Sequence, residues 1–193
     1  MLEAKQLRSL DAASAQIQTG DLLLFRSRGL IAWAGRGRHS HAAMAAWWSG
    51  ELFCMEVREW KGGRAVTLQS QVELYPASID HYRIAQPVAI AGHCPEFNRL
   101  RALEEMQKFM GQPYGWRSVS RLALRRCLGI RFCIPINLDD EFISDEPRFC
   151  SEAVSEAHKL AGRDPQRDLG DNCTEPADLA RSNIYEYVCT LLP

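Results

Sequence analysis

A cysteine stands where the sequence predicts the start of a helix. The segment 148–152, with the sequence RFCSE, follows Pro147 and opens an amphipathic stretch that we expect to be helical over 149–160. Free backbone N–H groups and the positive end of the helix dipole favour a thiolate at Cys150, and a thiolate is the attacking species in acyl transfer. The backbone N–H of Cys150 would also face a developing oxyanion. The competing interpretation is a buried cysteine at the start of a core helix.

A cysteine nucleophile needs a base, and three of the five histidines are poorly placed to act as one. His158 lies eight residues beyond Cys150 on the expected helix, which is about 12 Å along its axis. We expect His93 to lie in an exposed turn, and His81 to be a surface or pairing residue at the start of a polar strand. The base is therefore expected among the remaining two.

His39 and His41 flank Ser40 at the mouth of a strongly apolar strand. Because His41 is followed at once by Ala-Ala-Met, it is expected at a strand end with one face open. We predict that His41 is the base, with an ordinary strand histidine as the alternative. A metal site on His39 and His41 is a weaker hypothesis, because alternate strand positions give at most two histidines on one face and no cysteine pair is near.

A base in turn needs a group that orients its second ring nitrogen. Glu56 is a lone carboxylate within the apolar run 52–57, and the turn at 49–50 places it roughly opposite residues 41–43. A carboxylate in apolar surroundings is costly unless it is paired. We therefore predict that Glu56 pairs with His41. The alternative is that Glu56 faces outward on a two-sided strand.

The elements that must position these residues are short strands first and helices later. We expect a polar helix over 1–18 and one or two helical turns over 29–35. Expected strands, most of them in an antiparallel meander over 20–92, are 22–25, 41–48, 51–58, 65–68, 82–85, 88–90 and 185–191. Expected helices are 96–110, 119–128, 149–160 and 176–181, with an acidic loop over 133–147. This order indicates an α+β fold.

Length and composition are those of one ordinary globular domain, 1–193. The chain has 193 residues, 46% hydrophobic and 24% charged, with a net charge of -1. A chain with this charge balance has no net positive potential that would attract nucleic acid. The run 117–131 holds five arginines and no acid. We interpret it as a solvated helix face, and a docking patch for an anionic ligand or lipid headgroup is the alternative.

The N-terminal segment contains no apolar core long enough for a signal peptide, and nowhere do 18 apolar residues run together. We therefore expect a cytoplasmic protein without a transmembrane segment, with export by a dedicated route as the alternative. The seven cysteines are odd in number and show no CxxC motif or Cys/His ligand cluster. No metal and no cofactor are predicted, and the six cysteines other than Cys150 are interpreted as small buried thiols.

Several segments, in this order, resemble the circularly permuted NlpC-like papain-fold hydrolases of the YiiX/YebB type, in which the histidine strand precedes the cysteine helix. The segments are GDLLLF at 20–25, SHAAM at 40–44, MEV at 55–57, GQPYGW at 111–116, FCSE at 149–152 and TEPADLARS at 174–182. The resemblance spans roughly residues 19–185. The family's Gly-x-x-Tyr-Asp stretch has Gly115 in place of the acid, so no role of that acid carries over.

The resemblance implies a papain-like fold of the permuted type, with a central antiparallel meander or half-barrel packed against helices. It implies Cys150 as nucleophile, His41 as base and Glu56 as the orienting group. Tyr114 is expected to line the site or to help hold the oxyanion, and a plain packing aromatic is its alternative. The two serines next to these motifs, Ser40 and Ser151, are also expected near the substrate.

The activity implied is that of a cysteine peptidase or amidase, a thiol hydrolase that acts through a thioester intermediate. Peptidoglycan-type peptides or related amides are the expected substrates. A lipid acyl hydrolase or acyltransferase of the same fold, a catalytically silent binding module, and a toxin or effector with this core are the alternatives. The sequence does not distinguish peptide, amide and acyl-lipid substrates, nor does it indicate an oligomeric state.

Overall fold

The computed structural model describes residues 6–27, 37–85, 96–117, 119–120, 147–166 and 170–192. Within them the chain forms an α+β fold on a seven-stranded sheet, in the order β1-β7-β6-β2-β3-β4-β5. The strands are β1 (Leu7–Ser9), β2 (Leu22–Arg26), β3 (His39–Trp48), β4 (Glu51–Arg58), β5 (Gly62–Thr67), β6 (Ile79–Ile84) and β7 (Tyr185–Leu192). The helices are α1 (Leu10–Ser14), α3 (Leu68–Leu74), α4 (Arg99–Gln107), α6 (Cys150–Leu160), the 3-10 turn η2 (Asp171–Cys173) and α7 (Pro176–Leu179).

The hairpin of β3 and β4 is the clearest case of local sequence fixing structure. Its two turn residues, Ser49 and Gly50, have φ values of 51° and 81°, and two left-handed residues in a row give a turn whose twist matches that of the flanking strands. The turn sets the register in which Met44 faces Met55. The predicted strands 41–48 and 51–58 are thus confirmed, with β3 starting two residues earlier.

The sheet is not a simple meander, which corrects the expectation for residues 20–92. Strands β2 to β5 follow one another as antiparallel neighbours, but β6 pairs with β2 on the far side rather than with β5. The chain makes this crossing through α3, a helix that the strand pattern did not predict. The side chain of Thr67 caps α3 by accepting from the N–H of Ser70, a local signal that was available in the sequence.

The N-terminal prediction of one helix over 1–18 is also wrong where the structure describes it. Residues 7–9 form β1, which pairs in parallel with β7, and only 10–14 are helical. The side chain of Ser9 caps this short helix by accepting from the N–H of Ala12. The helical turns expected at 29–35, the strand at 88–90, most of the helix at 119–128 and nearly all of the acidic loop at 133–147 lie outside the described residues.

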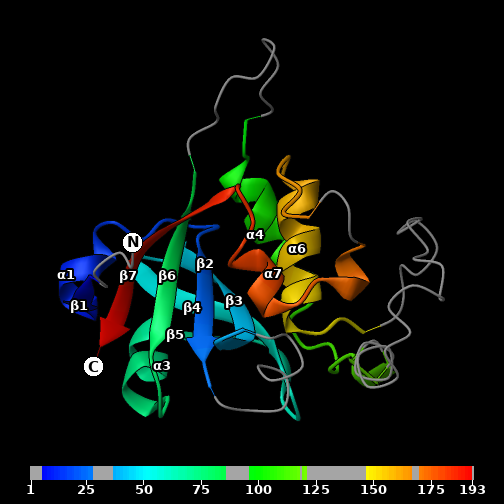
Figure 1. Cartoon of the computed structure of the whole chain (residues 1–193), viewed down its shortest axis with the longest axis horizontal. Helices are drawn as coiled ribbons and strands as arrows, with labels where there is room; N and C mark the ends of the chain where they lie inside the picture. The colour runs from blue at the N-terminus through cyan, green and yellow to red at the C-terminus, as the bar shows by residue number, and fades with distance from the viewer. Residues whose placement is uncertain are drawn as a thin grey trace.

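Helices cover both faces of the sheet, and each face has its own core (Figure 1). Helices α4, α6 and α7 lie against one face, where Ala42, Met44 and Met55 are buried. Helices α1 and α3 lie against the other face, where Ala43, Ala45 and Cys54 are buried. Alternate residues of β3 and β4 enter the two cores because successive side chains of a strand point to opposite faces. The predicted cysteine helix, α6, packs on the face that buries Ala42 and Met44. No helix in the described part of the chain is long and apolar enough to cross a membrane.

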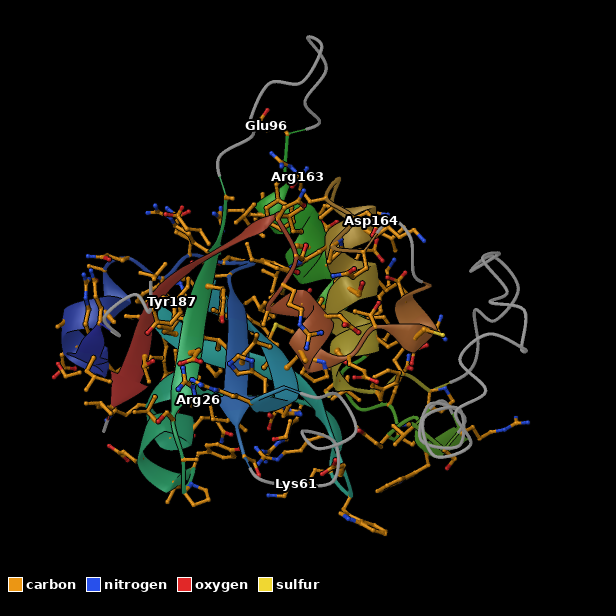
Figure 2. The ribbon with its side chains drawn as sticks, viewed as in Figure 1. Arg26, Lys61, Glu96, Arg163, Asp164 and Tyr187 are labelled. Atoms are coloured by element: carbon orange, nitrogen blue, oxygen red, sulfur yellow. The ribbon has the colours of Figure 1, made fainter. Side chains whose placement is uncertain are left out.

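The N-terminal end of α6 lies at the same end of the molecule as the β4–β5 turn. Figure 2 shows Arg163 and Asp164, which follow the C-terminal end of α6, at one end, and Arg26 and Lys61 at the other. Helix α6 begins at Cys150, so its first turn points toward the end where β2 finishes and the β4–β5 turn lies.

Candidate active site

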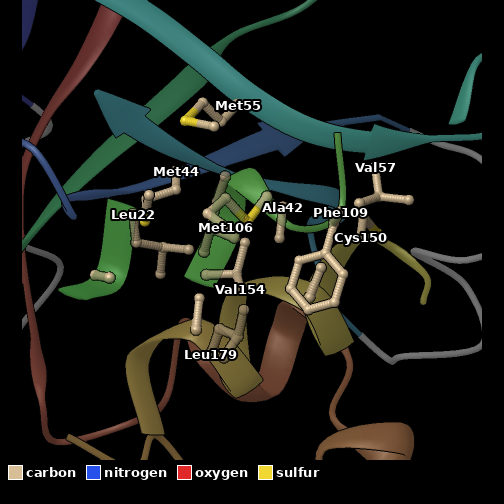
Figure 3. Close-up of a cluster of buried hydrophobic side chains, with 14 of the residues drawn as sticks. Leu22, Ala42, Met44, Met55, Val57, Met106, Phe109, Cys150, Val154 and Leu179 are labelled. Atoms are coloured by element: carbon tan, nitrogen blue, oxygen red, sulfur yellow. The ribbon is translucent and has the colours of Figure 1, made fainter. Parts of the chain in front are cut away.

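Cys150 is the first residue of α6, as the sequence predicted. Phe149 precedes the helix in an extended conformation, with φ of -101°. The carboxylate of Glu152 accepts a hydrogen bond of 3.2 Å from the Phe149 N–H, so one of the free donors at the helix start is satisfied by a negative side chain. The Cys150 side chain belongs to the buried cluster that also holds Val57 and Phe109 (Figure 3). The thiol therefore lies at the positive end of a helix, with apolar side chains around it.

His41 and Glu56 form a buried pair, which is the contact predicted from the two strands. The distance between His41 Nε2 and Glu56 Oε2 is 2.6 Å, and the Glu56 side chain is fully buried. A carboxylate can only accept, so Nε2 carries the proton. The second ring nitrogen, Nδ1, is then left for another partner, and Cys150 is the neighbour that most favours a charged His41 ring.

Electrostatics in this pair favour the charged form of both partners. Burial alone would lower the pKa of His41, but the charge of Cys150, a hydrogen bond with it, and then the bond and charge of Glu56 raise this pKa to about 9. Burial likewise works against the charge on Glu56, yet the hydrogen bond and the charge of His41, followed by two arginines, lower its pKa to about 2. The site thus stabilises an imidazolium between a carboxylate and a thiol.

Two arginines complete the surroundings of Glu56, and neither was predicted to contact it. Arg64 Nε donates to Glu56 Oε1 at 2.8 Å, and a second Arg64 nitrogen contacts the same oxygen. Arg58 Nη1 lies 3.4 Å from Glu56 Oε2 and also donates to Gln71 of α3 at 3.1 Å. The sequence held a signal for Arg58, because it follows Glu56 by two residues and so lies on the same face of the strand. Arg64 meets Glu56 only through the register of β4 and β5, in which the two residues lie directly opposite.

Tyr114 lies beside the thiol, so the resemblance pointed to a residue that the fold brings to this place. Burial, then the charge of Cys150 and of Glu59 and a hydrogen bond with Cys150, raise the pKa of the Tyr114 hydroxyl. The hydroxyl is therefore a neutral donor near neutral pH. The Gly115 N–H donates to the Arg148 carbonyl at 2.9 Å, and this hydrogen bond ties Tyr114 to the segment that enters α6.

The two serines expected near the substrate have different surroundings. The hydroxyl of Ser151 is fully buried and donates to the carbonyl of Thr174 at 2.7 Å. This bond ties α6 to the chain just before α7, so we leave Ser151 out of the proposed site. Ser40 is half-buried on β3 between the two histidines.

The other described histidines are held by partners of their own. His39 Nε2 lies 2.8 Å from Asp80 Oδ2, and His158 Nδ1 lies 2.5 Å from the Tyr185 hydroxyl. His81 was expected to be a surface or pairing residue. It is fully buried, and its Nε2 lies 2.8 Å from an Asp21 carboxylate oxygen. The surface alternative is therefore wrong, because the equally buried Asp21 offsets the cost of burying the imidazole.

The metal hypothesis on His39 and His41 finds no ligand set in the described part of the chain. The two histidines pair with different carboxylates, Asp80 and Glu56. Among the described residues, no group of three or more His, Cys, Asp or Glu side chains is arranged to hold a metal ion.

Comparison with known proteins gives a likeness of fold. No family model and no curated protein matches the chain. Among solved structures, the crystal structure of the metalloprotein YiiX from Escherichia coli superposes with a TM-score of 0.61 at 15% identity, covering 92% of this chain and 99% of that chain. At this identity the likeness establishes the fold alone, and it agrees at that level with the YiiX resemblance read from the sequence motifs.

Proposed function

We propose that this protein is a thiol hydrolase in which Cys150 is the nucleophile, His41 the base and Glu56 the group that orients His41. The observation that carries the proposal is the buried hydrogen bond of 2.6 Å between His41 and Glu56. The thiol at the start of α6 acts on the same imidazole ring and favours its charged form. A structural ion pair would not require a cysteine at that position. The finer assignment, a papain-like fold of the permuted NlpC type, is part of the same proposal and rests on the order of the motifs.

The proposed reaction has two steps, and His41 moves a proton in each. The Cys150 thiolate attacks the substrate carbonyl, and a new S–C bond forms while the carbonyl electron pair moves onto oxygen. The Cys150 N–H and the Tyr114 hydroxyl are the proposed donors to this oxyanion. When the intermediate collapses, the bond to the leaving group breaks and His41 gives that group its proton, which leaves a thioester. Water, deprotonated by His41, then attacks the thioester carbonyl; the S–C bond breaks, the carboxylic acid product leaves, and the Cys150 thiolate beside a protonated His41 is restored.

The substrate class follows the sequence-based expectation: a small peptide or amide, of the peptidoglycan type or related to it. Hydrolysis or transfer of a lipid acyl group is the alternative, since it uses the same nucleophile and the same thioester. No cofactor enters either reaction.

Trapping the acyl-enzyme tests the proposal. Activated acyl esters and peptide amides are mixed with the protein, the reaction is quenched in acid, and intact and digested masses are recorded. We expect the acyl mass on the peptide that contains Cys150. The variant Cys150→Ala should lose both the adduct and turnover without unfolding, whereas Cys189→Ala, which removes a buried cysteine from the opposite core, should keep both. Turnover that persists in Cys150→Ala would contradict the nucleophile assignment.

A further inference from the structure

The two oxygens of the Glu56 carboxylate are held by different partners. Oε2 lies 2.6 Å from His41 Nε2. Oε1 accepts from Arg64 Nε at 2.8 Å, and a second Arg64 nitrogen contacts the same oxygen. The last torsion of a glutamate side chain is broad and has no sharp rotamers, so a contact to one oxygen alone leaves the carboxylate free to turn. Contacts to both oxygens are therefore needed to fix the plane of the group that faces His41.

The backbone that carries Arg64 is held in place by the segment after α4. The preceding residue, Gly63, donates its N–H to the Gln112 carbonyl at 2.8 Å. A Cβ on Gly63 would lie 1.8 Å from the Phe109 carbonyl oxygen, so only a glycine allows the two segments to come this close. The same segment leads on to Tyr114 beside the thiol. Arg64 thus stands on a fixed part of β5, which suits a side chain that holds another group in place.

Arg58, the second arginine near Glu56, is held differently. Its Nη1 lies 3.5 Å and 3.4 Å from the two carboxylate oxygens, which is longer than the contact of 2.8 Å made by Arg64. It also donates to Gln71 at 3.1 Å, and its guanidinium lies 5.6 Å from the centre of the Tyr75 ring. Arg58 is therefore placed by its other partners and does not bind one oxygen of Glu56 in preference to the other.

The negative charge of Glu56 does not depend on Arg64 alone. Its cationic contacts in the described part of the chain come from three strands: His41 on β3, Arg58 on β4 and Arg64 on β5. Burial opposes this charge. The hydrogen bond with His41 and then the charge of His41 lower the pKa of Glu56, followed by Arg58 and last by Arg64. Arg64 makes the shorter of the two arginine contacts and yet comes last among these influences, which favours a role in geometry over a role in charge.

We propose that Arg64 is a positioning residue for the reaction, because by holding Oε1 of Glu56 it keeps Oε2 directed at His41 Nε2. The orientation of the imidazole ring, and with it the approach of Nδ1 to the Cys150 thiol, then depends on Arg64. This inference rests on the proposed function and deepens it, since it adds a fourth residue to the row of Cys150, His41 and Glu56. Arg64 acts through Glu56 and takes no part in making or breaking a bond.

Exchange of the His41 ring proton tests this role without any substrate. In protein labelled with 15N-histidine, NMR measures the rate at which the Nε2 proton exchanges with water, after circular dichroism has shown that each variant is folded. We expect Arg64→Met to speed this exchange by about tenfold or more, because a carboxylate that turns away no longer accepts from Nε2. Arg58→Met removes the same charge and should change the exchange rate by about twofold or less.

Arg64→Lys separates geometry from charge, since lysine keeps the charge but lacks the planar guanidinium that matches a carboxylate. We expect exchange that is faster than in the native protein by about threefold or more, and this variant carries the test if Arg64→Met does not fold. The matched control is Arg83→Met, which removes an arginine from an exposed ion pair with Glu186 and should leave exchange at the native rate. Native exchange in either Arg64 variant, or a rise in Arg58→Met equal to that in Arg64→Met, would overturn the inference.

Alkylation of Cys150 connects the positioning role with the reaction. Its rate with iodoacetamide near neutral pH should fall by about fivefold or more in Arg64→Met and stay within about twofold of native in Arg83→Met. An unchanged rate in Arg64→Met would overturn the inference. Faster His41 exchange in Arg64→Met, with no acyl-enzyme from any ester or amide, would contradict the hydrolase and keep Arg64 as the residue that holds the pair of His41 and Glu56. An acyl-enzyme on Cys150 together with native exchange in the Arg64 variants would keep the hydrolase and overturn the inference.

Discussion

At the scale of single residues, His41 is the centre of the proposed chemistry, because its two ring nitrogens face groups of different kinds. Glu56 fixes the proton on Nε2 by accepting from it at 2.6 Å. The other side of the ring is under the influence of Cys150. Such an arrangement keeps the tautomer and orientation needed for a base, and it stabilises the imidazolium that forms during the reaction.

The titration of His41 provides the first prediction. Its pKa, measured by NMR from the imidazole carbon shifts, should be about 9 in the native protein. Because Cys150 is the strongest influence that raises this pKa, Cys150→Ala should lower it clearly, and Glu56→Gln should lower it as well. His158 provides the internal control: burial, first among its influences, lowers its pKa to about 3, so it should stay neutral above pH 5. A His41 pKa that is the same with and without the Cys150 thiol would show that the two do not interact.

Glu56→Gln is a second prediction at this scale. The substitution removes a charge that His41, Arg58 and Arg64 all contact. Breaking a buried pair on one side costs about 3 kcal/mol, so the unfolding free energy from urea titration should fall by roughly that amount. Turnover should fall less than in Cys150→Ala or His41→Ala, because the amide oxygen of glutamine can still accept from Nε2. If Glu56→Gln proves more damaging than His41→Ala, Glu56 has another role.

The nucleophile, the base and the orienting group could be predicted from the sequence for physical reasons. The contacts that were not predicted also have a physical explanation. A cysteine after a helix-start signal, a histidine at a strand mouth and a lone carboxylate in an apolar strand are each unusual, and pairing resolves the cost of two of them. Arg64 could not be assigned to Glu56 because this pairing depends on the register of β4 and β5. The burial of His81 could not be predicted because its partner Asp21 lies 60 positions away in the chain.

At the scale of elements, close backbone approaches set where the site residues lie. Gly115 is the sharpest case: a Cβ there would come within 2.3 Å of the Pro147 carbonyl oxygen and 2.7 Å of the Arg148 carbonyl carbon. These are backbone atoms, which cannot make room by a change of side-chain rotamer. The departure from the Gly-x-x-Tyr-Asp motif is therefore built into this chain's packing, and it lets Tyr114 approach the start of α6.

Substitution at Gly115 tests this packing. Gly115→Ala should lower the unfolding free energy by about 3 kcal/mol, since overpacking against backbone is relieved only by moving a segment. Because that segment is either 114–116 or 147–148, the alkylation rate of Cys150 should change as well. Gly50→Ala is the control for the loss of a glycine, because nothing lies within 4 Å of a Cβ at Gly50 although its φ is 81°. A stable Gly115→Ala protein with an unchanged rate would contradict the packing argument.

Ser151 offers a prediction about how α6 is held. Loss of its hydroxyl leaves the Thr174 carbonyl without this donor, which costs about 1–3 kcal/mol for a buried acceptor. In Ser151→Ala the unfolding free energy should fall by this amount, while the Cys150 alkylation rate stays within about twofold. A normal unfolding free energy together with a large loss of the Cys150 alkylation rate would show that Ser151 belongs to the site.

Element boundaries were predictable where local chemistry decided them and not where pairing decided them. The β3–β4 hairpin and α6 follow from a turn and from a helix-start signal, and both were predicted closely. The position of β6 next to β2 depends on contacts between residues that are far apart in sequence, such as Leu22 with Tyr82. Short apolar runs carry no information about which neighbour they will pair with, so the meander was the natural but wrong choice.

At the scale of the whole molecule, the seven-stranded sheet separates two cores and places the candidate site at one end of one of them. The site's charged groups are buried, so they link folding to pH. The core between the sheet and helices α4, α6 and α7 contains Cys150 and Tyr114. Stability and protonation of the site are therefore expected to change together.

The unfolding free energy should be highest between about pH 4.5 and pH 6.5 and fall on both sides. Burial lowers the pKa of His158 from 6.5 to about 3, so its contribution grows as pH rises to 6.5 and offsets the loss from Glu152 over that range. The pKa of His41 is raised from 6.5 to about 9, so its contribution is complete below pH 6.5 and is lost as pH rises through 9. Burial raises the pKa of Glu152 from 4.5 to about 7, so ionisation of this group lowers stability between these values. The pKa of Glu56 is lowered from 4.5 to about 2, so its contribution is lost as pH falls below 4.5.

Urea unfolding between pH 3 and pH 9 measures this curve. Glu152→Gln should shift the maximum toward pH 6.5, because it removes the group whose ionisation opposes the gain from His158 as pH rises from 4.5. Stability that increases steadily from pH 5 to pH 9 would contradict the signs derived for His41 and Glu152.

The alkylation of cysteines by iodoacetamide across pH, resolved by mass spectrometry, tests the central claim most directly. The account predicts that Cys150 reacts faster than the other described cysteines below pH 7, including the partly exposed Cys173, and that His41→Ala removes this advantage. Cys150 labelling no faster than the other cysteines, or unaffected by His41→Ala, would contradict a thiol–imidazole site and leave the chain as a binding module with this fold.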